Sequence, residues 1–364
     1  MPTFESGEKT DKTAAAKLAA AKALFTQYDS AMAEAEEKQS SALLDRAERI
    51  LNRIEKIQLA KTVAEVEALL AEQGMSFLAV AKEQTKALKA RRGLDLEFKP
   101  AEPEITQEQL DVFHDMFGEK NLEPMILPTP EQFNEKYMDA LYPPKETADD
   151  KAKGIINHYP EWWDKESSER YKTKQRETWG KVFVHSMQAE LQMRQKASPG
   201  ENPVILLESV RKPNYISGNQ HYGSTEGTDP TLDPLLPIIQ EVFGEDATRF
   251  NHSHDELVNQ LIPRVKEKII AKLKSQGLAI PSFDVILAPA VACNLQTVLN
   301  HPENSQTNTW ELSSDILLDK DGKDSGSRLD VGSAGHGGAG GVNDAHRGAH
   351  GGGRGFRLAV VLEK

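Results

Sequence analysis

The sequence has a single cysteine, Cys293, so no disulfide can form within the chain. Small secreted domains usually depend on disulfides, and the scarcity of cysteine therefore favours a reducing compartment. Basic charge is also in deficit: 44 lysines and arginines stand against 56 aspartates and glutamates, which gives a formal net charge of −12. A negative protein repels the phosphates of nucleic acids and of anionic lipids, so this balance argues against both as partners.

Long apolar runs are missing as well. No stretch reaches the roughly 20 apolar residues that a membrane-spanning helix needs. The start of the chain, Met1 to Glu8, is polar and acidic and does not have the pattern of a secretion signal. Together these absences predict a cytoplasmic protein without a membrane partner.

Glycine and proline are rare in the first 98 residues, which are rich in alanine, glutamate, lysine and leucine. Apolar residues recur there at spacings of three and four, which places them on one face of a helix. We expect residues 1–98 to form a helical hairpin or a short coiled coil. The apolar faces either pack on each other or join copies of the chain into a homo-oligomer. The two stripes are Leu18, Ala21, Phe25, Tyr28 and Met32, and Leu43, Ala47, Ile50, Ile54 and Ile57. Helix is also expected over Thr62–Leu70 and Ser76–Lys89, with a break at Gly74 and a C-terminal cap at Gly93.

Residues 99–202 are expected to be a mostly helical linker region. Lys99–Glu104 contains prolines and predicts a linker, and helices are predicted at Thr106–Phe117 and Thr129–Leu141. After Pro203, short apolar runs alternate with helical patterns and no regular βαβ repeat is present. This predicts an α+β domain over residues 203–364. Strands are predicted at Val204–Leu207, Asp284–Ala288 and Phe356–Leu362, helices at Asp233–Phe243 and Asp255–Leu273, either type at Ala290–Leu299, and a loop at Lys320–Ser327.

A glycine-rich segment, Val331–Gly355, lies between two stretches with the character of a core. Trp310-Glu311-Leu312 precedes it and Gly355-Phe356-Arg357-Leu358 follows it. Glycine-rich stretches are usually flexible, because glycine loses the most entropy when it is ordered. A strand pattern after the segment nevertheless favours an ordered structure.

These bracketing residues resemble the C-type lectin fold of the formylglycine-generating-enzyme type. The resemblance is closer still to the variable proteins of diversity-generating retroelements, which carry that fold at their C-terminus. It is carried by Asn308–Leu312, Ser327–Gly332 and Gly355–Leu358, and it covers roughly Val204–Lys364. It implies a C-type-lectin-like domain. In that family a retroelement changes adenines in the last segment of the gene, and so changes the amino acids that this segment encodes. The hypervariable side chains would then form a binding surface for a ligand, which we expect to be a protein.

The composition of Ser333–Arg354 agrees with this implication, because only Ser, Ala, Gly, His, Val, Asn, Asp and Arg occur there. Changing the adenines of codons that begin with two adenines and keep a third-position pyrimidine can give Ser, Gly, His, Ala, Asp, Arg or Asn, but not Lys, Glu, Gln, Met or Trp. Simple drift in composition is the alternative explanation. The family pattern marks as candidate ligand-binding positions Ser333, Gly335, His336, Gly340, Gly341, Asn343, Asp344, His346, Gly348, His350, Gly351, Gly352, Gly353 and Arg354. It marks as framework Val331, Gly332, Ala334, Gly337, Gly338, Ala339, Val342, Arg347, Gly355, Phe356, Arg357 and Leu358. We expect Arg347 and Arg357 to pair with acids or carbonyls, or Arg347 to be a plain surface residue.

Catalytic and metal sites are not favoured. Formylglycine-generating enzymes need two active-site cysteines, whereas Cys293 stands alone in an apolar stretch and is expected to be a buried, inert thiol. His252, His254 and Asp255 could form a metal site, but Asp255 is better interpreted as a helix N-cap with the histidines in an exposed loop.

Two further patterns have plain structural interpretations. His346 and His350 have the spacing of metal ligands on a helix, and the glycines around them argue against a helix. Asp319, Asp321 and Asp324 with Gly322 fit a solvated acidic turn better than a calcium loop.

The sequence therefore predicts a ligand-binding protein that is not an enzyme and needs no metal or cofactor. Its expected fold class is α+β, with a helical N-terminal module followed by a C-type-lectin-like domain. The alternative is a structural or adaptor protein that assembles through its N-terminal helices. A metal-dependent enzyme on the same fold ranks third.

Overall fold

The computed structural model divides the chain into two compact units, Met1–Ser76 and Phe77–Lys364. The boundaries expected after residues 98 and 202 both fall inside the second unit. The structure describes scattered positions between 17 and 59, and then residues 76–118, 121–134, 136–137, 181–196, 199–215, 220–223, 227–301, 303–304, 307–319, 321–332 and 342–364.

The described residues of the first unit are helical, as the spacing of apolar residues predicts. Ile54 is 2% exposed, whereas Leu18 and Leu59 keep 58% and 79% of their surface. The Lys17 ammonium donates to the carbonyl oxygen of Gln58 at 2.9 Å, so two stretches of this unit lie side by side. The turn between them, Thr62–Leu70 and Gly74 lie outside the described residues.

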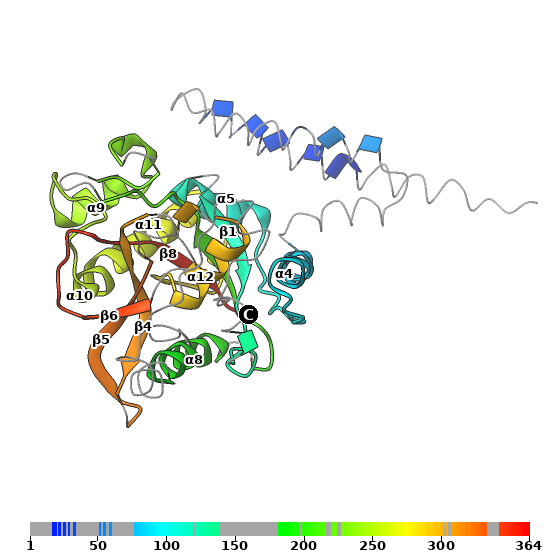
Figure 1. Ribbon diagram of the computed structural model, residues 1–364. Helices are drawn as coiled ribbons and strands as arrows, with labels where there is room; N and C mark the ends of the chain where they lie inside the picture. The colour runs from blue at the N-terminus through cyan, green and yellow to red at the C-terminus, as the bar shows by residue number, and fades with distance from the viewer. Residues whose placement is uncertain are drawn as a thin grey trace, which may run out of the picture. The chain divides into compact units, whose positions relative to one another are not determined.

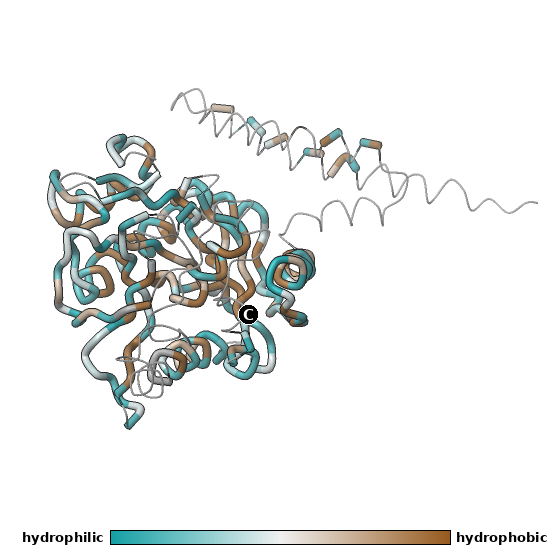
Figure 2. Tube along the Cα trace, in the orientation of Figure 1, coloured by the Kyte–Doolittle hydropathy of each residue, from teal (hydrophilic) through white to brown (hydrophobic). Residues whose placement is uncertain are grey.

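The second unit has a mixed α+β fold, which confirms the expected class. Its first sheet has the strand order β1-β2-β8-β3, with every pair antiparallel (Figure 1). The strands are β1 (Leu122–Ile126), β2 (Val204–Glu208), β3 (Phe283–Leu287) and β8 (Leu358–Leu362). β2 and β8 are buried at every position, because they are the inner strands and are covered on both faces. Figure 2 shows that the hydrophobic residues, drawn in brown, are concentrated in this interior.

Strand β1 was not predicted from the sequence, because Pro124 lies at its centre. Proline cannot donate to a ladder and is tolerated in edge strands, and β1 is an edge strand. Its outer side is covered by helix α4 (Phe77–Arg92). The Gln84 side chain donates to the Ile126 carbonyl at 2.6 Å and accepts from the Ile126 N–H at 3.1 Å. The Gln84 side chain thus satisfies the two backbone groups of Ile126 that a neighbouring strand would otherwise bond.

The second sheet has the order β6-β5-β4-β7, and β7 runs parallel to β4. Its strands are β4 (Trp310–Leu318), β5 (Asp324–Val331), β6 (Val342–His346) and β7 (Arg354–Phe356). Helix α8 (Lys181–Gln195) lies against β4, where the Ser314 hydroxyl donates to Glu190 at 2.7 Å. The predicted loop Lys320–Ser327 is wrong in its second half, because β5 begins at Asp324.

Most predicted helices are confirmed with shifted ends. The Thr106 hydroxyl caps α5 (Gln107–Phe117), and Gly93 ends α4 at φ 62°. Ala290–Leu299, left open between strand and helix, is helix α12. Of Thr129–Leu141 the structure describes turns up to Asn134 and a helical pair at 136–137. The remaining helices are α9 (Leu236–Phe243), after a short 3-10 turn at Pro230–Leu232, then α10 (His254–Glu256), a π turn (Leu257–Leu261) and α11 (Ile262–Ser275).

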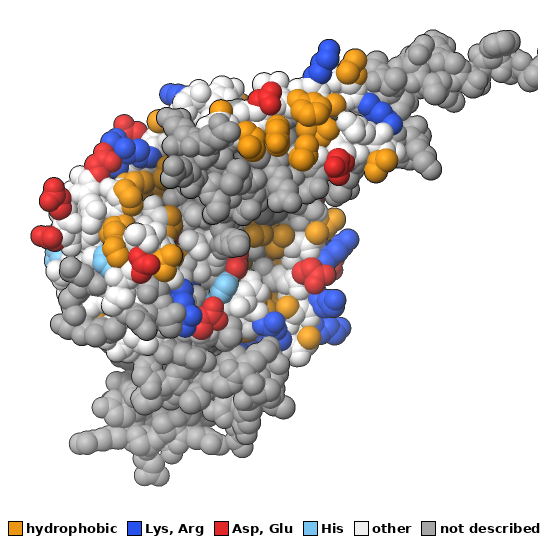
Figure 3. All heavy atoms as spheres, turned by 90° about the horizontal axis from the view of Figure 1, so that it is seen from above, with side chains coloured by type: hydrophobic (Ala, Val, Ile, Leu, Met, Phe, Trp, Pro, Cys, Tyr) orange, Lys and Arg blue, Asp and Glu red, His pale blue; other side chains and the backbone are white. Residues whose placement is uncertain are grey.

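No helix in the described part of the chain is long and apolar enough to cross a bilayer. On the face drawn in Figure 3, acidic and basic side chains are interspersed with apolar ones.

Candidate ligand-binding site

The candidate positions that the structure describes run along one surface strip from β6 to β7. Asp344 and His346 lie on β6, Gly348 and His350 follow in the loop, and Gly351–Arg354 lead into β7. His346, Gly348, His350 and Gly352 are exposed, and the others are half-buried. Ser333, Gly335, His336, Gly340, Gly341 and the side chain of Asn343 lie outside the described residues.

The framework positions beside this strip are mostly buried. Val331, Val342 and Phe356 are each at most 5% exposed, and Arg357 is 1% exposed. Arg347 differs, since its side chain is 51% exposed and lies 3.4 Å from Asp255. The prediction that Arg357 pairs with an acid is confirmed, and Arg347 is the surface residue that was the alternative.

Two framework glycines are needed for steric reasons. A Cβ on Gly355 would lie 2.3 Å from the hydroxyl oxygen of the buried Tyr222. Gly332 has φ 104°, and a Cβ there would lie 2.2 Å from the Lys212 ammonium nitrogen. Any side chain at either position would force the neighbouring core to move, because atoms cannot approach so closely.

A buried ionic network anchors the end of the strip. Arg249, with no exposed surface, donates to Glu208 at 2.8 and 2.9 Å and to Asp233 at 2.7 to 3.0 Å. The Leu358 N–H donates to Glu208 at 2.6 Å. The strand that follows the strip is thereby tied to β2 through charged hydrogen bonds, which are stronger than neutral ones.

A second buried pair lies next to it. Arg357 donates to both carboxylate oxygens of Glu311 at 2.7 Å. Burial alone would raise the pKa of Glu311, but Arg357 and the nearby Lys212 hold that pKa below its usual value. Cys293 is buried, as predicted, and burial raises the pKa of its thiol to about 12, which disfavours the reactive thiolate.

The interpretation of His252, His254 and Asp255 was wrong in two respects. Ser253, not Asp255, is the N-cap, and it forms a capping box with Glu256. The histidines are 8% and 7% exposed and do not lie in an exposed loop. Burial lowers the pKa of both rings, that of His254 to about 4, so both are neutral at neutral pH.

The histidine pair His346 and His350 and the acidic stretch Asp319–Asp324 form no metal site among the described residues. His346 ends β6 and His350 lies in the following loop, so no helix aligns them. The Asp319 side chain accepts from the N–H groups of Asp321 and Lys323 at 2.8 and 2.9 Å, which closes an exposed turn. Within the described ranges, no group of three or more His, Cys, Asp or Glu side chains is placed to hold a metal ion.

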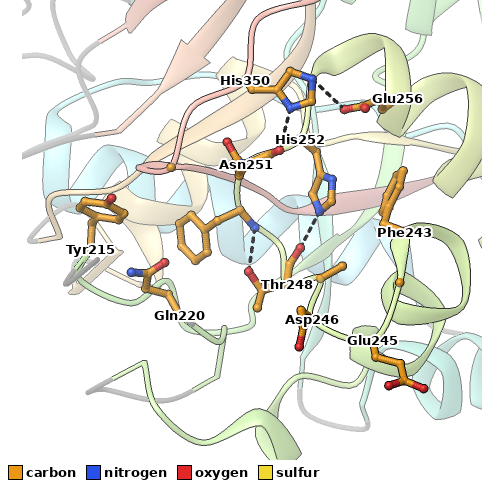
Figure 4. A pocket seen from close by; sticks show the side chains of 14 residues that line it. Tyr215, Gln220, Phe243, Glu245, Asp246, Thr248, Asn251, His252, Glu256 and His350 are labelled. Atoms are coloured by element: carbon orange, nitrogen blue, oxygen red, sulfur yellow. Dashed lines mark hydrogen bonds and ion pairs between the residues drawn. The ribbon is translucent and has the colours of Figure 1, made fainter. Parts of the chain in front are cut away.

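The strip also forms one wall of a pocket of about 700 Å³ (Figure 4). The His350 ring donates from Nδ1 to the carbonyl oxygen of Asn251 at 2.8 Å, and its Nε2 lies 3.4 Å from Glu256. Opposite it, the His252 ring donates from Nε2 to the Thr248 carbonyl at 2.6 Å and stacks on Phe243, with 4.2 Å between the ring centres. The lining residues are Tyr215, Gln220, Phe243, Gly244, Glu245, Asp246, Ala247, Thr248, Phe250, Asn251, His252, Glu256, His350 and Gly352.

Sequence reasoning missed most of this pocket. Its walls come from segments about 100 residues apart, and only His350 and Gly352 were candidate positions. Tyr215, Gln220 and Phe250 belong to no motif that marks a ligand. The Ser253-x-x-Glu256 pattern was a readable signal, because this spacing is typical of a capping box.

Arg354 is a candidate ligand-binding position that also pairs with a buried aspartate. This pair predicts how the stability of the fold depends on pH. Its Nε lies 2.8 Å from a carboxylate oxygen of Asp330, which is 1% exposed. Burial raises the pKa of Asp330 to about 6, and Arg354 only partly opposes this. Ionising Asp330 therefore costs the folded state more than the unfolded state, so its contribution to stability falls as pH rises from about 4 to about 7.

We expect this loss to be roughly 2 kcal/mol for the wild type relative to Asp330→Asn, and larger in an Arg354→Ala background. Urea unfolding of the wild type, Asp330→Asn, Arg354→Ala and the double variant at several pH values measures this loss. A difference between wild type and Asp330→Asn that does not change with pH would contradict this assignment.

Comparison with protein-family models, with curated proteins and with solved structures gave no match to this chain.

Proposed function

We propose that this chain is a ligand-binding protein that displays a diversified surface on a C-type-lectin-like scaffold, as the variable protein of a diversity-generating retroelement does. One observation carries the proposal. Of the candidate positions described between Val342 and Leu358, four are exposed and four are half-buried, whereas the framework residues that flank them, Val342 and Gly355–Leu358, are buried. On this proposal the ligand is a protein, the chain is not an enzyme, and no cofactor is needed.

The arrangement of the strands supports the proposal. β2 and β8 pair with each other at the centre of the first sheet, so the chain between them is an excursion that starts and ends in the core. The strip lies within that excursion, and its exposed side chains are not part of the buried ionic network. Side chains that point to solvent can change with little effect on the fold.

The most direct test is the DNA beside the gene. We expect a near-identical non-coding repeat of the segment encoding residues 333–354 that differs at adenines, next to a reverse transcriptase gene. If independent copies of the gene vary at framework codons such as Phe356 as often as at codons of the strip, the proposal is wrong.

A display library tests the binding face itself. Interface hot spots favour Trp, Tyr and Arg. Of the eight candidate positions whose side chains the structure describes, four are glycine. A Cβ on Gly353 would meet its nearest atom at 3.9 Å and one on Gly348 at 3.5 Å, which are ordinary contacts. We expect Tyr or Trp at these two positions to leave folding intact and to raise the frequency of binders.

The matched control is a library of the same size at Glu267 and Lys268, which are on α11 and outside the pocket. Equal binder frequencies from the two libraries would mean that the strip has no special capacity for binding.

An adaptor that assembles through its N-terminal helices is the second candidate. The exposed apolar side chains of the first unit favour it, because Leu18, Phe25 and Leu59 are 58%, 43% and 79% exposed. Sedimentation equilibrium of the full chain tests it. Self-association that Leu18→Asp with Leu59→Asp abolishes would support assembly, and a monomer at all concentrations would exclude it.

A further inference from the structure

Helix α8 packs against strand β4 with a face that mixes apolar and acidic side chains (Figure 1). Met187 and Leu191 are at most 1% exposed. Glu190 shares their face of the helix, because residues three and four apart lie side by side, and it is also 1% exposed. Asp315 of β4 has no exposed surface. Each of the two elements that pack together here therefore carries a buried carboxyl group.

Each of these carboxyl groups has one oxygen that is bonded and one that is not. Oε1 of Glu190 accepts from the Ser314 hydroxyl at 2.7 Å and lies 3.0 Å from Nε of Arg194. Oδ2 of Asp315 accepts from the Ala290 N–H at 2.7 Å, at the start of α12. The other two oxygens, Oε2 of Glu190 and Oδ1 of Asp315, have no hydrogen-bond partner among the residues that the structure describes. Buried polar atoms without a partner are costly, so native proteins rarely keep them without a role.

A single proton would satisfy both of these oxygens. An ionised carboxylate only accepts hydrogen bonds, whereas a protonated carboxyl group also donates one. Burial raises the pKa of Asp315 to about 7, and the negative charge of Glu190 adds to this rise. Two carboxylates that share a buried site resist ionising together, because their charges repel each other in a medium of low dielectric constant. A proton on Asp315 makes it a donor and leaves Glu190 to accept.

The charged groups around the pair balance one negative charge and not two. Arg194 is the cation beside Glu190. The Cys293 thiol of α12 interacts with Asp315 and stays neutral, because its pKa is about 12. His185 of α8 is exposed. The other ionisable groups on β4 and on strands β3, β5 and β7 are in ion pairs, which are Arg328 with Asp324, Asp330 with Arg354, Glu311 with Arg357, and Asp284 with Lys266.

We propose that α8 is a pH-sensitive strap, held against β4 by one proton that Glu190 and Asp315 share and loosened when that proton is lost. When α8 leaves β4, the carboxyl group of Asp315 returns to water, where its pKa is about 3.8. The docked state therefore binds the proton more tightly than the undocked state. Docking is strongest below about pH 4, weakens as the pH rises to about 7, and changes no further above that. This inference does not depend on the proposed function.

Hydrogen exchange of the full chain at about pH 5 and about pH 7.5 tests the inference. Rates are converted to protection factors, which removes the intrinsic pH dependence of exchange. The amides of α5 are the internal reference, because they report changes in the stability of the whole unit, including the change that Asp330 causes. We expect the amides of α8 to lose at least about tenfold in protection relative to α5 at the higher pH, since one pKa unit is a tenfold change in the docking equilibrium.

Two variants keep the shape of the pair and remove one of its carboxyl groups. Asp315→Asn should abolish the loss, because the new amide donates to Glu190 at every pH. Glu190→Gln should reduce the loss without abolishing it, because burial still raises the pKa of Asp315 when the neighbouring charge is gone. Glu83→Gln on α4 is the matched control, since Glu83 is exposed, and it should keep the full loss. Protection of wild-type α8 that does not fall relative to α5, or a full loss in Asp315→Asn, would overturn the inference.

Discussion

Replacing Arg249 with leucine is expected to destabilise the second unit by about 5 kcal/mol, the upper end of the range for breaking a buried ion pair. The variant would leave Glu208 and Asp233 without their cation in a place where neither side chain has exposed surface. Since whole domains are stable by only about 5–15 kcal/mol, this loss amounts to about one third or more of the total stability. Chemical denaturation followed by circular dichroism measures the loss.

Arg347→Leu is the control, because the Arg347 side chain is half exposed and lies 3.4 Å from the exposed Asp255. Such surface pairs contribute little, so its effect should stay within about 0.5 kcal/mol. An Arg249→Leu effect as small as that of the control would show that the network does not hold the fold together.

Replacing Phe356 with alanine is expected to cost roughly 3–5 kcal/mol, as is usual for removing a buried phenylalanine. The ring has no exposed surface, meets His252 edge-on with 6.3 Å between the ring centres, and lies 5.5 Å from the Arg249 guanidinium carbon. His346→Tyr, at an exposed position of the strip, should change stability by no more than about 0.5 kcal/mol. A larger effect at His346 than at Phe356 would reverse the division into framework and display positions.

The elements predicted correctly are those whose local pattern agrees with their place in the fold. Thr106 and Gln109 signal the start of α5 within four residues, and Val204–Leu207 reads as a buried strand because both faces are covered. β1 was missed because Pro124 argues against a strand unless its position at a sheet edge is known. That position depends on pairing with residues some 80 positions later, which no local pattern contains.

The candidate site shows the same division. The burial of Val342 and Phe356 agrees with the framework role that the bracketing motifs predict, whereas Arg347, predicted as framework, is exposed. The pocket could not be predicted, because Gln220, Phe243 and His350 come together only through the tertiary fold. The burial of His252 likewise results from its packing between Phe243 of α9 and Phe356 of β7, and not from any feature of its own segment.

The position of β8 has a consequence for how the chain is made. This strand follows the glycine-rich segment in the sequence, yet it lies between β2 and β3 in the first sheet. The ribosome must therefore translate the whole segment in frame before the sheet can close. A gene copy with a frameshift or a stop codon in that segment would encode a protein without β8, and its first sheet could not close. The topology thus makes the closing of the first sheet depend on the reading frame of the segment.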